Sequence, residues 1–230
     1  MVYVHSPQKK PYSEVATLAV AISGDEDQRH LGVLIRIEPE EHLKFVHLAF
    51  HHDLRCGEPE SDAFYVECSG LDPDEQLTFA VWVEAVQDAN GPNIPYSFAY
   101  TSGNFDSSGR FIRREDGVGL TCATFVVALF EDFAFPIVDV ESWSPRADDV
   151  DFQKKIVNAL TKCCPGAHTE AQREAIGKAS RFRPEEICGC AHVCDGTPLR
   201  FEEGVRLGVE VLTQMRAHWA DSQNELQPAG

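Results

Sequence analysis

Residues 30–37 read HLGVLIRI and residues 45–52 read FVHLAFHH. Apolar side chains recur at every second position, at 31–37 in the first stretch and at 46–50 in the second, which is the period of a β-strand that has one face in a core. His30 is expected on the face opposite the apolar one. The alternate apolar residues that we expect to enter the core from the first stretch are Leu31, Val33 and Ile35.

Further strands and several helices are expected around this pair. The apolar stretch TLAVAIS at 17–23 predicts a buried strand, and 63–68 predicts another. Capping residues and helical spacing predict helices near 71–90, 122–133, 150–162, 170–179, 184–192 and 202–219. The loop 92–119 is long enough to indicate a segment that faces a substrate. We therefore expect an α+β fold with an antiparallel sheet.

Composition limits the classes of function. The chain has 230 residues, 43% of them apolar, which is enough for one sizeable core. Its formal charge of −17 opposes binding to nucleic acid or to anionic lipid. No apolar run reaches membrane-spanning length and no secretory signal is evident, so we expect a cytoplasmic protein whose eight cysteines are reduced.

Cys122 is the strongest candidate for a reactive residue. Thr121 is expected to cap a helix that starts at Cys122 and has the apolar stripe of a core helix. A cysteine in a first helical turn lies beside free backbone N–H groups, which favour the thiolate and can bind an oxyanion. The alternative is that Cys122 is a small apolar residue in a packed helix.

His30 and His47 are the candidate partners of this cysteine. Each is followed two positions later by a small residue, Gly32 and Ala49, which leaves room for a helix end or a substrate. One histidine could take the proton of Cys122 while the other orients it. The alternative is that both are partly exposed strand residues without a role.

Three segments together resemble the motifs of circularly permuted papain-like cysteine enzymes, the group with the lecithin:retinol acyltransferase-like and permuted NlpC-type proteins. They are HLGVLI at 30–35, FVHLA at 45–49 and LTCATFV at 120–126, and PYSF at 95–98 is similar to a Tyr-containing segment of that group. The resemblance extends roughly from residue 15 to residue 135. It implies a permuted papain-like core.

The resemblance also implies roles for single residues. Cys122 would be the nucleophile, His30 the general base and His47 the orienting residue. A second register would make His47 the base, with His51 or Glu67 as the third member. The asparagine that often precedes the cysteine is absent, and so is the membrane anchor of the retinol-modifying members. A peptide, amide or isopeptide substrate is therefore favoured over a lipid.

A second group of possible ligands lies at residues 188–194, which read CGCAHVC. Zinc could use three or four of Cys188, Cys190, His192 and Cys194. Structural zinc sites usually pair two separated C-x2-C knuckles, and a helix would spread these side chains around its axis. We therefore expect small residues of a packed helix, and neither a metal nor another cofactor.

These observations lead to one main hypothesis and one alternative. Residues 1–145 are expected to form the permuted papain-like domain, and 146–230 a helical extension packed on it. The expected activity is that of a cysteine hydrolase or acyltransferase that works through a thioester. The alternative is a non-catalytic acidic binding or immunity-type protein with the same fold, whose charge masks a basic partner.

Overall fold

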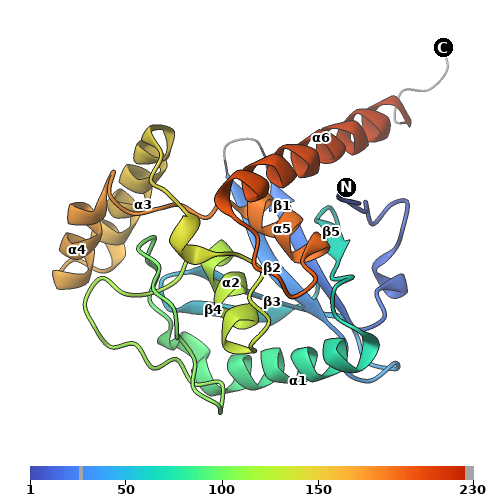
Figure 1. The fold of residues 1–230 in the computed structure, drawn as a ribbon, viewed down its shortest axis with the longest axis horizontal. Coiled ribbons are helices and arrows are strands. Elements are labelled where there is room, and N and C mark those ends of the chain that lie inside the picture. The colour runs from blue at the N-terminus through green and yellow to red at the C-terminus, as the bar shows by residue number, and fades with distance from the viewer. Residues whose placement is uncertain (26–27, 226–230) are drawn as a thin grey trace.

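The computed structural model describes residues 1–25 and 28–225 and shows an α+β fold with a five-stranded sheet (Figure 1). The strands are β1 (Leu18–Gly24), β2 (Arg29–Ile35), β3 (Lys44–Phe50), β4 (Asp53–Gly57) and β5 (Phe64–Glu67). The α-helices are α1 (Pro73–Asn90), α2 (Cys122–Asp132), α3 (Val150–Cys163), α4 (Ala167–Ala175), α5 (Pro184–Val193) and α6 (Phe201–Glu225). The expected α+β class is confirmed.

The sheet has the order β4-β3-β2-β1-β5, and every neighbouring pair is antiparallel. The first four strands pair with one another in chain order, and the chain then returns to pair β5 with β1. An antiparallel sheet is the expected result of short hairpin connections. The predicted antiparallel arrangement is therefore confirmed.

The two faces of the sheet are buried to different extents. The main core contains Leu31, Val33 and Ile35, as their period of two predicts, together with residues of α1, α2, α5 and α6. The opposite face is not open, because Leu34 and Phe45 belong to a second, smaller buried cluster. Residues near the N-terminus, including Val15, help to close this cluster.

Several helices cover the main face. α2 contacts β2 and β3, whereas α5 contacts β1, β2 and β5 and packs on α6. Figure 1 shows α6 extending beyond the sheet near the N-terminus, while α3 and α4 lie at the other end of the molecule. Helices from the last third of the chain thus lie at opposite ends of the molecule.

The sequence did not predict β4, and it misplaced the ends of two helices. β4 is an edge strand in which Arg55 and Cys56 are exposed, so its residues lack the apolar alternation that marks a strand. α4 ends at Ala175, before the positive φ of Gly177, rather than at residue 179. α6 continues well past residue 219.

Residues from both expected domains form the main core, which includes Val33 and Phe125 as well as Ile187 and Leu207. The division at residue 145 therefore remains a prediction. Among the helices of the described residues, none combines the length and the apolar character that crossing a bilayer requires.

Candidate active site

Cys122 is the first residue of α2. The Thr121 hydroxyl accepts a hydrogen bond from the Thr124 N–H at 3.1 Å, and the Thr124 hydroxyl accepts one from the Thr121 N–H at 2.7 Å. This capping box fixes the first turn. The N–H groups of Cys122 and Ala123 have no intrahelical acceptor in this turn, so Cys122 lies beside backbone donors.

The start of α2 lies where β2 and β3 separate. The pairing of these strands joins Val33–Ile35 to Lys44–Val46, and the first residues of β2 lie beyond it. The Leu31 N–H is within reach of the Cys122 thiol and acts to lower its pKa. Cys122 therefore lies against the residue that follows His30 in the chain.

His30 and His47 form a hydrogen-bonded pair between His30 Nε2 and His47 Nδ1. Their ring centroids are 4.6 Å apart, and Phe45 stacks on His47 at 4.5 Å. A Cβ atom added at Gly32 would lie 2.7 Å from the Cβ of His47, so glycine permits this close approach. The structure thus brings together the two histidines that the sequence analysis singled out.

Both imidazoles are neutral near pH 7. Burial is the largest cause that lowers the pKa of each to about 4, and the charge of His47 further lowers the pKa of His30. A neutral imidazole has one N–H donor and one acceptor nitrogen. When His30 Nε2 donates to His47, the lone pair of His30 lies on Nδ1, which can accept a proton.

One cavity of about 490 Å³ is lined by both Cys122 and His30. His47 reaches this cavity only through its hydrogen bond to His30. Among the hydrogen bonds of the described residues, none joins the Cys122 thiol to either imidazole. The structure therefore places the cysteine and the first histidine at the same cavity, but not in hydrogen-bond contact.

The resting state of Cys122 differs from the expectation of a stabilised thiolate. The residue is 6% exposed, and burial raises the pKa of its thiol above the ordinary value. Backbone N–H groups and the charge of Arg181 act in the opposite direction but do not outweigh burial. Desolvation penalises the charged form more than one helix start can stabilise it, so the thiol is neutral.

Other walls of the cavity come from residues that the sequence analysis did not assign to the site, most of them in segments after residue 145. They include Phe50, Phe152, Lys155, Ile156, Arg181 and Phe182. The one sequence signal for this part is the spacing of the α3 residues, which share a helical face. Tyr96 also lines the cavity, and its segment forms a parallel bridge with Leu120, just before the cysteine. The long loop thus contributes to the site.

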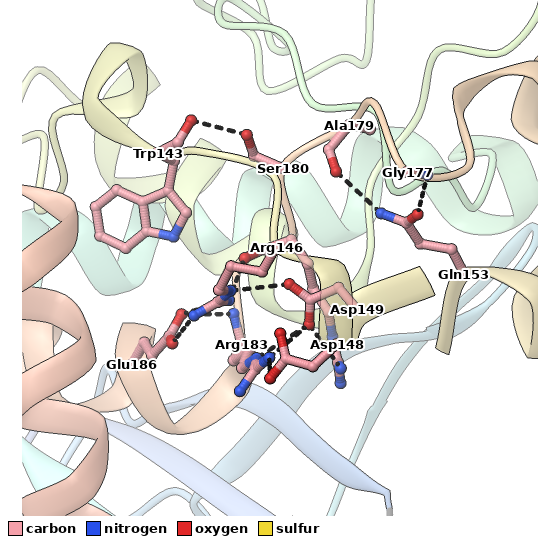
Figure 2. Close-up of polar contacts among 11 residues, drawn as sticks. Trp143, Arg146, Asp148, Asp149, Gln153, Gly177, Ala179, Ser180, Arg183 and Glu186 are labelled. Carbon is pink, nitrogen blue, oxygen red and sulfur yellow. Dashed lines mark hydrogen bonds and ion pairs between the residues drawn. The ribbon is translucent and has the colours of Figure 1, made fainter. Parts of the chain in front are cut away.

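An ion cluster holds the segments on either side of α3 and α4 together (Figure 2). Asp149, whose side chain is 1% exposed, accepts from Arg146 at 2.9 Å, from Arg183 at 2.9 Å and from Arg181 at 3.3 Å. Arg146 also binds Glu186 at 2.5 Å. The cluster therefore fixes Arg181 at the cavity and joins α3 to α5.

The residues of the second register lie elsewhere. His51 Nδ1 accepts a hydrogen bond from the Tyr96 N–H at 3.1 Å. Glu67 lies on β5, which β1 and β2 separate from β3, and it pairs with Lys10 at 2.8 Å. The structure joins neither residue to His47 by a hydrogen bond within its described part.

The group at residues 188–194 lies on and just after α5. Cys188, Cys190 and His192 are buried, and burial raises the pKa of both thiols. His192 Nδ1 is 2.7 Å from the Glu67 carbonyl oxygen, which ties α5 to β5. Among the described residues, no group of three or more His, Cys, Asp or Glu side chains is arranged to hold a metal ion.

Comparison of the chain with known protein families, with curated proteins and with solved structures found no significant match.

Proposed function

We propose that the protein is a thiol-dependent hydrolase or acyltransferase that acts on a peptide, amide or isopeptide bond through a thioester at Cys122. One observation carries this proposal. Cys122, at a capped helix start, and His30, backed by His47, line the same cavity. A nucleophile, a base and an orienting group are the three parts that such chemistry needs.

The proposed core is a permuted papain-like one. Two consecutive strands supply the histidines, and a later helix on the same sheet supplies the cysteine, in the order of the resemblance. The α+β class is observed. The permuted papain-like assignment is supported by this order and by the hydrogen-bonded histidine pair.

Because the Cys122 thiol and the His30 imidazole are both neutral, the first step must include transfer of the thiol proton. The Cys122 sulfur attacks the carbonyl carbon while His30 Nδ1 takes the thiol proton, and the carbonyl electron pair moves to oxygen. Backbone N–H groups at the start of α2 stabilise this oxyanion. His47 stabilises the resulting imidazolium of His30 through their hydrogen bond.

The oxyanion then collapses and the bond to the leaving amine breaks as His30 returns its proton to the nitrogen. In the second half, water or another nucleophile attacks the thioester and His30 again takes the proton; the C–S bond then breaks and His30 returns this proton to the Cys122 sulfur. Because no hydrogen bond joins Cys122 to His30 in this state, a small movement must close the gap during attack.

The test uses a neutral acyl donor, p-nitrophenyl butyrate. We expect a burst of nitrophenolate close to one equivalent and a butyryl group on Cys122 by mass spectrometry. Cys122→Ala should abolish the burst, and His30→Ala should slow it roughly 10²- to 10⁴-fold, the usual contribution of a general base. Cys163→Ala removes an exposed cysteine and serves as the control that keeps the burst.

A butyryl group spread over Cys56 and Cys163 while Cys122 stays unmodified would refute the proposal. So would a burst in Cys122→Ala equal to that of the wild type. An unchanged rate in His30→Ala would remove the base from the mechanism.

A further inference from the structure

The cavity at Cys122 is lined by positive charge in a negatively charged protein. Arg29, Lys155 and Arg181 line it, and no Asp or Glu among the described residues does. The chain has 37 acidic and 20 basic residues, so three basic side chains without an acidic one depart from its average composition. A cavity lined by one sign of charge concentrates ligands of the other sign.

Arg181 is held in place and directed by its neighbours. Its guanidinium carbon lies 3.5 Å from the centre of the Phe152 ring, and its Nη1 is 3.3 Å from Asp149. Asp149 does not line the cavity, and it shares its charge with Arg146 and Arg183. A single ion pair, through Nη1, leaves other N–H groups of the Arg181 guanidinium for a ligand.

The other two cations differ in their partners. Arg29 is paired with Glu185 at 3.5 Å, and both side chains are largely buried. Lys155 is an exposed residue of α3 at the cavity, and no ion pair of the described residues includes it. Among the cations that line the cavity, Lys155 thus has no ion pair within the described residues, and Arg181 has one, to a carboxylate that it shares with two other arginines.

The rest of the lining is apolar. Aromatic and aliphatic side chains from four segments line the same cavity, namely Phe50, Tyr96, Phe152, Ile156 and Phe182. A volume of about 490 Å³ lies in the range of small-molecule sites, which combine an apolar lining with a few placed polar groups. The lining thus fits a ligand with one apolar part and one anionic part.

We propose that the site takes substrates that carry an oxyanion, a carboxylate or a phosphate, next to an aromatic or aliphatic group, and that Lys155 and Arg181 bind the oxyanion. This inference rests on the proposed function for the reaction, but the binding that it predicts does not require the reaction. Arginine and lysine both bind such groups, and arginine does so with two parallel hydrogen bonds.

The experiment separates binding from chemistry by using the Cys122→Ala protein. Calorimetry would compare N-acetylphenylalanine, which is an anion, with N-acetylphenylalaninamide, which has nearly the same shape without the charge. We expect the anion to bind roughly 10- to 100-fold more tightly, because that ratio corresponds to the free energy that hydrogen bonds to a charged group typically contribute. Phenyl phosphate tells whether phosphate or carboxylate is preferred.

Three variants in the same background locate the binding. Lys155→Gln and Arg181→Gln should each remove most of the preference for the anion. Lys154→Gln should keep it, because Lys154 is the neighbouring exposed lysine on α3 and does not line the cavity. Lys155→Gln changes an exposed side chain, so it tests the inference even where Arg181→Gln fails to fold.

Equal binding of the acid and the amide, or no binding of either anion, would overturn the inference and leave the butyrate experiment unaffected. The same preference in Lys155→Gln as in Lys154→Gln would also overturn the role of Lys155. Conversely, absence of acyl transfer to Cys122 with intact anion binding would refute the proposed function alone.

Discussion

At the scale of single residues, the site is defined by groups that are neutral because they are buried. His30 and His47 share a hydrogen bond, and burial holds the pKa of both near 4. The thiol of Cys122 is also neutral, because burial raises its pKa. For the proposed reaction, these pKa values predict attack by a neutral thiol with proton transfer to a neutral imidazole.

The histidine pair predicts how stability depends on pH. A histidine has a pKa near 6.5 when unfolded, so between about 6.5 and 4 the unfolded chain binds protons that the folded pair does not. The contribution of the neutral pair to the free energy of unfolding is therefore fully present above pH 6.5 and is lost as the pH falls toward 4. We expect His47→Asn to make the free energy of unfolding less dependent on pH in this window.

Urea unfolding at several pH values between 7 and 4.5 would measure this difference. The wild type should take up about one more proton on unfolding than His47→Asn does, since the variant lacks one such group. His42→Asn, which changes an exposed histidine, should follow the wild type. Parallel curves for the wild type and His47→Asn would show that His47 titrates normally in the folded protein.

At the scale of elements, the sequence predicted the strands and helices that short stretches of sequence determine. The period of two placed β2 and β3, and the Thr121 cap placed the start of α2 at Cys122. The edge strand β4 was missed because it buries too little apolar surface to leave a pattern. The second buried face was missed because part of its cover, Tyr12 and Val15, comes from the stretch just before β1, which carries no strand pattern.

The candidate site could be predicted only in part for the same reason. Cys122, His30 and His47 lie in motifs whose chemistry can be read along the chain. Arg181 and Lys155 meet them only because α3 and the segment before α5 fold back over the start of α2. The burial that keeps Cys122 neutral also depends on those segments, so the sequence suggested a thiolate.

The cap of α2 gives a prediction at this scale. Thr121→Ala removes the acceptor for the Thr124 N–H and half of the capping box, so it should cost about 1 kcal/mol of unfolding free energy. Urea unfolding would measure the loss. Thr78→Ala is the control, since Thr78 is exposed within α1 and should change stability by less than about 0.5 kcal/mol. Equal effects of the two substitutions would show that the Thr121 cap adds nothing.

At the scale of the whole molecule, the last third of the chain is joined to the first by both core and surface contacts. α5 packs on the sheet, and α6 holds the N-terminal residues: the Gln214 side chain accepts from the Val4 N–H at 2.9 Å and donates to the Val2 carbonyl at 2.6 Å. The cavity is built from both parts as well. We therefore expect the two parts to unfold together.

The ion cluster around Asp149 offers the sharpest test of this coupling (Figure 2). Asp149→Asn keeps the shape of the side chain but leaves Arg146, Arg181 and Arg183 without their shared charge. Removing one member of a buried ion pair typically costs about 3–5 kcal/mol. The loss falls mainly on Arg181, because Arg146 keeps Glu186 and Arg183 keeps Asp148. Asp151→Asn is the matched control, since the Asp151 side chain is 90% exposed.

Unfolding of Asp149→Asn should be followed with two probes, far-ultraviolet circular dichroism and hydrogen exchange of the β2 amides. If the molecule is one cooperative unit, both probes should report the same loss of stability, although β2 contacts none of the substituted atoms. Loss of protection in α3 and α4 alone, with β2 unchanged, would instead show that this helical segment unfolds independently. The cavity would then lose one wall while Cys122 and His30 kept their places, and acylation by a neutral ester would survive the loss of anion binding.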